Sequence, residues 1–299
     1  MPLTLSLHKA CREQPDRLAV VCGDRRTTFA ELGARVARLA GALRSLGVAR
    51  GDRVAVLAPN GDRFLETVYA ALWLGAVLTP LNYRWSADEL AYALDDSTPR
   101  VLLVDDAFAP LLPALSEKAR SLPAVIVMGE GHAPEGALPY EALLQSAQTV
   151  GDVYVGGDAP AVLFYTGGTT GRSKGVLLSH AGLFSTTLAS ISIGERAPGA
   201  VCLHALPMFH VGGLAVVLQA MTGQCTQVML PAFDPAVFFA LIEREQVIEA
   251  ALVPTMIKRV VDHPEIRTRK LSSLQRLYYG ASPIDATLLE QTIECLPGV

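Results

Sequence analysis

The segment YTGGTTGRSKG, residues 165–175, contains four glycines, three threonines, an arginine and a lysine, directly after the apolar run AVLF. Glycine lets consecutive backbone N–H groups point into one concavity, and threonine hydroxyls add further donors. Lys174 adds a mobile positive charge. This combination predicts a loop that binds a polyphosphate, here called the glycine–threonine loop (residues 166–174).

Other interpretations of these residues fit less well. A Walker A loop requires G-x-x-x-x-G-K-[ST], but Ser173 stands where its second glycine belongs and Gly175 where its hydroxyl belongs. Residues 171–175 match the G-x-S-x-G pattern of serine hydrolases, whose serine sits in a sharp turn straight out of a strand. Ser173 instead lies eight residues past Tyr165. A hydrolase and a surface loop with chance glycines remain the alternatives.

The composition limits the class of protein. The chain has 299 residues, 51% of them hydrophobic, so it can bury a large core. A net charge of −4 argues against a nucleic-acid or acidic membrane partner. The five cysteines contain no CxxC pair, so they suggest neither a disulfide framework nor a zinc site. We find no signal peptide and no transmembrane stretch, and we expect a soluble protein of the reducing cytoplasm.

Strand and helix patterns alternate along the chain, which predicts an α/β fold with layered, mainly parallel sheets. An apolar stripe predicts a helix over residues 28–46 that begins at a capping box and ends at Gly47. The other elements that we expect in the first half are strands at 53–59, 100–105 and 124–129 and helices at 63–75, 86–94 and 108–122.

The alternation lapses between about residues 129 and 160, where glycine, proline and alanine dominate. We therefore expect two α/β subdomains, 1–150 and 151–299, with the glycine–threonine loop in the second. The expected strands of the second half are 161–165, 201–206, 226–230, 248–253 and 276–280, and a helix is expected at 235–246. Loops at the carboxyl ends of parallel strands are where open α/β sheets bind ligands.

The segment YTGGTTGRSKGV resembles the phosphate-binding motif of the adenylate-forming (AMP-binding) superfamily, whose usual form is Tyr-Thr-Ser-Gly-Thr-Thr-Gly-x-Pro-Lys-Gly. The chain departs from that form at Gly167 and Ser173. Further segments follow in the order that the superfamily has. They are residues 27–60, GAVLTPLN at 75–82, LPMFHVGG at 206–213, VPTMI at 253–257 and YYGASPI at 278–284. The resemblance implies the N-terminal domain of an acyl-CoA synthetase, an acid–CoA ligase.

The resemblance also implies roles for individual residues. ATP would be bound by Thr166, Gly167, Gly168, Thr169, Thr170, Gly171, Lys174, Gly280, Ala281 and Ser282. The carboxylic acid, fatty or aromatic, would be bound by Met208, Phe209, His210, Val211, Gly212 and Gly280. Lys174 and His210 would be the catalytic residues, and Thr166 would lie beside Mg²⁺. Adenylation brings two anions together, so these residues would offset charge at the phosphates before the acyl group passes to coenzyme A.

Some residues receive a structural interpretation. His204 is expected to be a histidine within a strand, and Trp73 and Trp85 are expected to be packing residues. The carboxyl pairs at 95–96 and 105–106 are expected at turns and caps. A lone histidine such as His210 would ordinarily be a hydrogen-bonded core residue, but its place in LPMFHVGG favours the acyl site.

The resemblance also implies later segments, including a C-terminal lid domain, that do not lie within residues 1–299. We therefore expect the N-terminal portion of a longer enzyme, poorly active alone, and a homodimer is possible. The remaining alternatives are a nucleotide-binding protein that lost catalysis and an amino-acid adenylation domain. No carboxylate stands within LPMFHVGG to meet a substrate amine, so an acid without an amine fits better.

Overall fold

The computed structural model describes residues 1–130, 133–166, 172–194 and 199–299. The chain forms two compact units, each described here by itself. Unit 1 comprises Met1–Glu13, Ala30–Pro59 and Arg63–Thr186, and unit 2 comprises Gln14–Phe29, Asn60–Asp62 and Thr187–Val299. This division differs from the expected boundary near residue 150. The physical reason is that the strand after residue 160 pairs with the sheet of the first half, where Val162 lies opposite Leu78.

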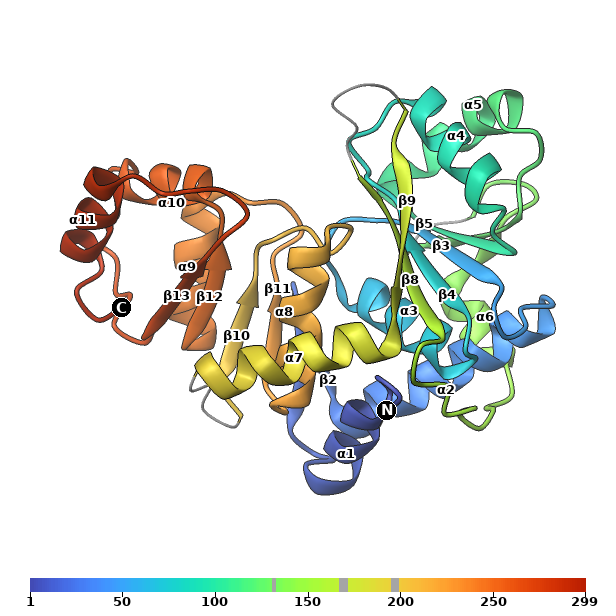
Figure 1. Cartoon of the computed structure of the whole chain (residues 1–299), viewed down its shortest axis with the longest axis horizontal. Helices are drawn as coiled ribbons and strands as arrows, with labels where there is room; N and C mark the ends of the chain where they lie inside the picture. Colours follow the sequence, from blue (N-terminus) through green and yellow to red (C-terminus); the bar gives the residue numbers. More distant parts are fainter. Residues whose placement is uncertain (131–132, 167–171, 195–198) are drawn as a thin grey trace. The chain divides into compact units, whose positions relative to one another are not determined.

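The sheet of unit 1 is parallel except at one edge (Figure 1). Among the described residues its strands run in the order β7 (Leu138–Pro139), β6 (Ala124–Met128), β5 (Val101–Asp105), β3 (Arg53–Leu57), β4 (Val77–Pro80), β8 (Pro160–Thr166) and β9 (Lys174–Ser179). The strand β9 is antiparallel to β8 and forms that edge. The central strands β3 and β5 are almost wholly buried, as expected of parallel strands covered on both faces.

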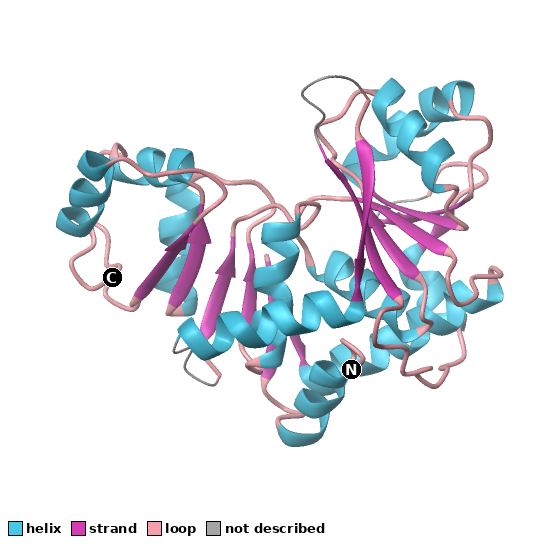
Figure 2. Ribbon diagram, viewed as in Figure 1, coloured by secondary structure: helices cyan, strands magenta, loops and turns pink. Residues whose placement is uncertain are grey.

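The sheet of unit 2 is parallel except for its hairpin strand. Its order is β13 (Arg276–Tyr279), β12 (Glu249–Leu252), β10 (Val201–His204), β11 (Thr226–Met229), β1 (Leu18–Cys22) and β2 (Arg25–Thr28). The chain steps from β10 to β11 in one direction and from β11 back to β12 in the other. Because such crossovers are right-handed, their helices must lie on opposite faces of the sheet. Figure 2 shows helices on both of its faces.

The helices, in chain order, are α1 (Leu5–Glu13), α2 (Phe29–Ser45), α3 (Asp62–Trp73), α4 (Ala87–Ser97), the 3₁₀-helix η1 (Asp106–Leu111), α5 (Leu112–Lys118), α6 (Tyr140–Ser146), α7 (His180–Gly194), α8 (Val211–Thr222), α9 (Pro235–Glu245), α10 (Pro254–Val261) and α11 (Ala286–Cys295). Local chemistry sets several of their ends. Ser86 and Glu89 form a capping box at the start of α4. Asp234 accepts hydrogen bonds from the first turn of α9, which has Pro235 at its start.

The predicted α/β fold is confirmed, as are most of the expected strands and helices. One predicted helix is not continuous in the structure. The expected helix over 108–122 is the short 3₁₀-helix η1 followed by the seven-residue α5. Two prolines explain this difference, since Pro110 lies within η1 and Pro113 near the start of α5, and proline lacks the N–H that a continuous helix requires. No helix in the described part of the chain is long and apolar enough to cross a membrane.

Unit 1 contains a buried network of charges between α2, α3 and α6. Glu66 is 1% exposed and accepts hydrogen bonds from Arg35 Nε and from the Tyr140 hydroxyl, both at 2.6 Å. Arg35 also pairs with both oxygens of Glu141, at 2.9 and 3.0 Å. Burial alone would raise the pKa of Glu141, but the hydrogen bonds from Arg35 and Arg63 lower it. The network ties three helices together through one carboxylate.

His180, the first residue of α7, makes the stability of unit 1 depend on pH. It is fully buried, and its Nδ1 accepts a hydrogen bond from the backbone N–H of Leu3 at 3.5 Å. Burial and the positive N-terminus lower the pKa of His180 to about 4. The unfolded chain therefore binds the proton at higher pH than the folded chain, so stability is lost as the pH falls from about 6.5 towards 4.

We expect this loss to approach about 1.4 kcal/mol per pH unit in that window. Urea unfolding at a series of pH values measures it, and His180→Leu should remove that contribution to the slope. A slope between pH 6.5 and 4 that is the same in wild type and His180→Leu would contradict the assignment.

Candidate functional site

The glycine–threonine loop joins two antiparallel strands of unit 1. Thr166 is the last residue of β8 and Lys174 the first of β9, and the two are direct partners across the ladder. The Thr166 hydroxyl donates to the Lys174 carbonyl at 3.4 Å. Both residues are exposed. The ladder thus brings the two ends of the loop together, while the predicted residues Gly167, Gly168, Thr169, Thr170 and Gly171 lie outside the described residues.

The two cations near the loop differ in their surroundings. The guanidinium of Arg172 lies 5.2 Å from the centre of the Tyr92 ring, a cation–π contact. Lys174, in contrast, has no ion-pair partner among the residues that the structure describes. Its charge is therefore available to an anion that binds where the loop joins β9.

Tyr165 anchors the loop to the core of unit 1. Its hydroxyl donates to Asp96 Oδ2 at 2.6 Å, and its ring meets Trp85 edge-on at 6.2 Å. Burial, followed by the Asp96 carboxylate, raises the pKa of Tyr165, which stays a neutral donor. Trp85 is a packing residue as predicted, and Asp105 caps η1 as predicted. Asp96 has a further role as the acceptor that holds Tyr165.

The segment LPMFHVGG of unit 2 runs from the end of β10 into α8. Its predicted acid-binding residues divide into two groups. Met208 and Phe209 are buried, at 0% and 3% exposure. His210, Val211 and Gly212 are exposed, and His210 is the N-cap residue of α8. The ring of His210 lies 4.3 Å from that of Phe209. His210 is thus a surface residue and not a core residue, whereas Met208 and Phe209 anchor the segment in the core of unit 2.

Asn60, which is not among the predicted site residues, fixes this segment. Its side chain is buried, and its Nδ2 donates to the carbonyls of His204 and Leu206 at 3.1 and 2.9 Å. Its Oδ1 accepts from the backbone N–H of Met208 at 2.8 Å. One side chain therefore satisfies three backbone groups just before His210. A polar residue between a buried strand and a helix, in RVAVLAPNGD, is the signal that could have found it.

Asn60→Asp is expected to lower the free energy of unfolding by about 2–3 kcal/mol, because two carbonyls lose their donor and face a carboxylate instead. Chemical denaturation followed by intrinsic fluorescence measures this change. Asn82→Asp is the matched control, because Asn82 only accepts a hydrogen bond, from the backbone N–H of Arg84 at 3.0 Å. Equal effects of the two variants would argue against the role of Asn60.

The start of α8 packs so closely against the preceding backbone that residue 213 must be glycine, whereas residue 212 need not be. A Cβ on Gly213 would lie 2.1 Å from the carbonyl oxygen of Pro207, whereas a Cβ on Gly212 would meet open space. We expect Gly213→Ala to cost about 1–3 kcal/mol in stability. Gly212→Ala should be neutral or stabilising by up to about 1 kcal/mol, since alanine favours the helix. Thermal unfolding of both variants checks this, and a larger loss for Gly212→Ala would refute the packing.

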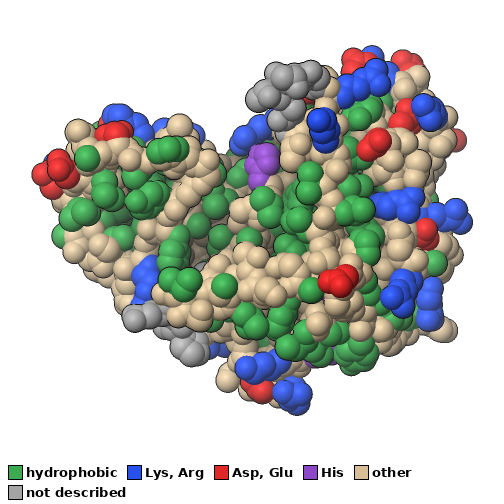
Figure 3. Space-filling model, viewed as in Figure 1, with side chains coloured by type: hydrophobic (Ala, Val, Ile, Leu, Met, Phe, Trp, Pro, Cys, Tyr) green, Lys and Arg blue, Asp and Glu red, His purple; other side chains and the backbone are tan. Residues whose placement is uncertain are grey.

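The third predicted group, Gly280, Ala281 and Ser282, follows the outer strand β13 of unit 2. All three residues are exposed. Ala281 has a φ of 68°, which is rare for a residue with a Cβ. Tyr279 and Ile293 are 49% and 55% exposed, and Figure 3 shows hydrophobic side chains at the surface of unit 2. The turn after β13 thus presents backbone and small side chains at the surface, which suits the close approach of a flat ring.

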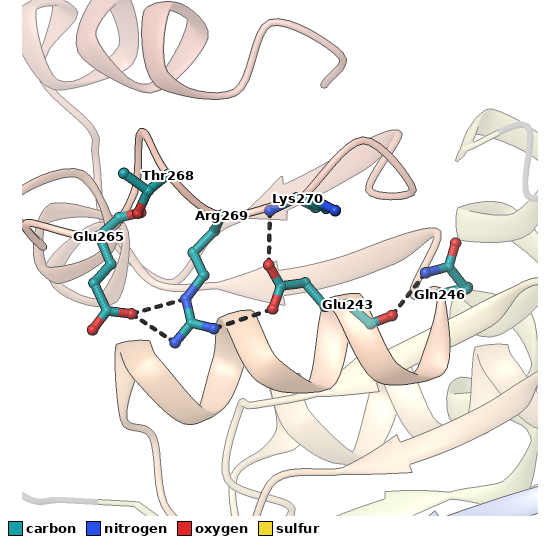
Figure 4. Close-up of a pocket in the computed structure, with 6 residues that line it drawn as sticks. All are labelled: Glu243, Gln246, Glu265, Thr268, Arg269 and Lys270. Atoms are coloured by element: carbon teal, nitrogen blue, oxygen red, sulfur yellow. Dashed lines mark hydrogen bonds and ion pairs between the residues drawn. The ribbon is translucent and has the colours of Figure 1, made fainter.

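A separate hollow of unit 2, of about 640 Å³, is polar and internally paired (Figure 4). Arg269 contacts Glu243 at 3.1 Å and Glu265 at 2.6 Å. The backbone N–H of Lys270 donates to Glu243 at 2.7 Å, which with Arg269 lowers the pKa of that carboxyl. Because the guanidinium is already held by two carboxylates, this hollow offers little net positive charge to a phosphate.

Comparisons with known proteins agree with the predicted α/β fold and with the family resemblance. The family described as "AMP-binding enzyme" matches residues 7–299. The chain is 36% identical over 288 residues to a feruloyl-CoA synthase of Amycolatopsis sp., covering 96% of this chain and 55% of that protein. It is 38% identical over 267 residues to a long-chain-fatty-acid–CoA ligase of Thermus thermophilus, covering 88% and 49%.

The fold also matches solved structures. ATP-bound MatB from Rhodopseudomonas palustris superposes with a TM-score of 0.85 at 26% identity, covering 99% of this chain and 58% of that one. The chain thus spans about half the length of the curated relatives that it matches.

Proposed function

The chain belongs to the family of AMP-binding enzymes, and from this premise we propose that it is the N-terminal part of an ATP-dependent acid–CoA ligase. In such an enzyme the carboxylate attacks the α-phosphate of ATP, which gives an acyl-adenylate and pyrophosphate, and the acyl group then passes to coenzyme A with release of AMP. The curated relatives named above are CoA ligases that differ in their acids. Their agreement supports the reaction class more strongly than it supports any one substrate.

The observation that carries the proposal is the β8–β9 hairpin. It holds the ends of the glycine–threonine loop together and presents Lys174 without a competing carboxylate among the described residues. In this proposal the Lys174 ammonium binds the β- and γ-phosphates and offsets the charge that develops as pyrophosphate leaves. Tyr165, held by Asp96, keeps the base of the hairpin in place.

The residues also fit a magnesium ion at this loop. Thr166 is exposed, and within the described part of the chain its hydroxyl makes only a long hydrogen bond, at 3.4 Å, so its oxygen is available as a hard ligand. Mg²⁺ bound there would neutralise the phosphates of ATP. The protein's own contribution is to orient the nucleotide through the loop and to keep Lys174 directed at it.

The acid, in this proposal, is apolar and without an amine. The segment that bears His210 consists of apolar residues and glycine apart from that histidine, and it contains no carboxylate that would meet an amine. The two curated relatives act on a feruloyl and a long-chain fatty acyl group, by their names. We therefore propose a fatty or aromatic acid, with His210 beside the acyl carboxylate and Gly280–Ser282 beside the adenine.

Binding of acyl-sulfamoyl adenosines, which mimic the acyl-adenylate, tests this proposal on the chain itself. We expect one member of a series with short, long and aromatic acyl groups to bind more tightly than sulfamoyl adenosine alone. His210→Ala should weaken that member and leave the unacylated compound unchanged. If the acyl group adds no affinity in any member, the assignment of an acid site to this chain is wrong.

A further inference from the structure

A cluster of metal-binding side chains lies inside unit 2, on strands that the proposed reaction does not use. Cys202 is on β10, Cys225 directly precedes β11 and Glu249 is on β12. All three side chains are buried. One ligand atom from each lies within 4.8 Å of the others. Their immediate surroundings are small and apolar, namely Ala200, Ala220 and Ile248.

The register of the sheet explains why these residues meet. Cys202 lies directly opposite Glu249 on one side and Gln227 on the other, so the three side chains share one face. Cys225, two residues before Gln227, shares that face too. Ala220 of α8 belongs to the same cluster, so this is the face that α8 covers. Ligands from three adjacent strands thus converge under one helix.

We propose that Cys202, Cys225 and Glu249 bind one Zn²⁺ ion. Thiolate sulfur and carboxylate oxygen are ligands that zinc prefers, and the ligand atoms of a tetrahedral zinc site lie about 3.3–3.8 Å apart. The Cys202 thiol donates to Glu249 Oε1 at 2.8 Å, and the other distances between ligand atoms are at most 4.8 Å. Zinc would replace this proton and that of Cys225, the first distance would lengthen, and the ligand atoms would then reach the spacing of a tetrahedral site.

The charge balance at this place favours a divalent cation. Two thiolates and one carboxylate carry three negative charges, which Zn²⁺ reduces to one. Arg276 lies opposite Glu249 on β13 and supplies the remaining positive charge. Its Nη1 is buried and has no hydrogen-bond partner among the described residues. With zinc bound, the group formed by these four residues and the ion is electrically neutral, as burial requires.

Gln227 is the residue that we assign to the fourth ligand position. It is fully buried, and neither its amide oxygen nor its amide nitrogen has a hydrogen-bond partner in the part of the chain that the structure describes. Such a group is costly unless it binds something. Its register places Gln227 beside Cys202 on the strand opposite to that of Glu249.

Metal analysis of the reduced chain tests the proposal. We expect one zinc per chain by mass spectrometry of protein purified from zinc-supplemented medium. Cobalt titrated into the metal-free chain should produce a thiolate-to-cobalt charge-transfer band that saturates at one equivalent. Cys202→Ser and Cys225→Ser should each weaken cobalt binding more than about 100-fold. Gln227→Leu should weaken it about 10-fold.

Cys22→Ser is the matched control, since Cys22 is a buried cysteine of the same sheet that lies outside the cluster. It should keep both the stoichiometry and the cobalt band. Wild-type protein that binds less than stoichiometric zinc and shows no cobalt band overturns the proposal, even if the cysteine variants fail to fold. A Cys202–Cys225 disulfide in the intact mass under non-reducing conditions, with no metal after reduction, also overturns it.

Discussion

Glu66→Ala is expected to lower the free energy of unfolding by about 3–5 kcal/mol, because it leaves Arg35 and Tyr140 without the carboxylate that they share. Glu66 is 1% exposed, so water cannot replace the lost oxygen atoms. The hydrogen bonds from Arg35 and Tyr140 are short, at 2.6 Å, and they come from different helices. Urea unfolding at neutral pH measures the loss, and circular dichroism should show that the folded variant keeps its helices.

Glu130→Ala is the matched control for this prediction. Glu130 also pairs with an arginine of the network, Arg63, at 2.5 Å, but its side chain is 73% exposed. We expect this variant to change stability by less than about 1 kcal/mol, because an exposed ion pair is screened by solvent. If Glu66→Ala and Glu130→Ala lowered the free energy of unfolding by the same amount, burial would not determine how much these ion pairs contribute to stability.

Lys174→Met is expected to reduce kcat/KM for ATP about 100- to 1000-fold in the full-length ligase that we propose. The substitution keeps the length of the side chain and removes the charge that β9 presents beside Thr166. Folding should not change, since Lys174 is exposed and has no ion-pair partner among the described residues. Acid-dependent exchange of radiolabelled pyrophosphate into ATP measures the loss.

Lys118→Met provides the comparison for this variant. Lys118 is a surface lysine of unit 1 whose charge is already paired with Asp88 at 2.6 Å. We expect Lys118→Met to leave the rate of ATP–pyrophosphate exchange unchanged. If Lys174→Met retains the wild-type kcat/KM for ATP, the lysine does not contact the phosphates in the transition state, and the role given to the hairpin is wrong.

Much of the fold could be predicted because local patterns determine it. Buried strands such as β3 and β5 are mostly apolar runs, and the predicted start at Thr28 and end at Leu46 match the bounds of α2 within one residue. The division into units was not predictable from those patterns. It depends on which strand β8 joins, and composition near residue 150 says nothing about the partner of Val162.

The candidate site, like the division into units, could be predicted only where its residues are close together in the sequence. The glycine–threonine loop was recognisable because its residues are contiguous, whereas the three contacts of Asn60 lie about 150 residues away in the sequence. The zinc ligands that we propose were hidden for the same reason. Cys202, Cys225 and Glu249 are separated by 23 and 24 residues, so no short metal motif exists, and only the order of the strands brings them together.

Acid-dependent ATP–pyrophosphate exchange by the full-length protein is the most direct test of the central claim that this chain belongs to a carboxylic acid–activating ligase. We expect exchange that requires an added fatty or aromatic acid, is lost without Mg²⁺ and falls sharply in Lys174→Met. Addition of coenzyme A should then yield the corresponding thioester. Exchange that is absent with every acid of the series, or that does not depend on the acid, would contradict the account.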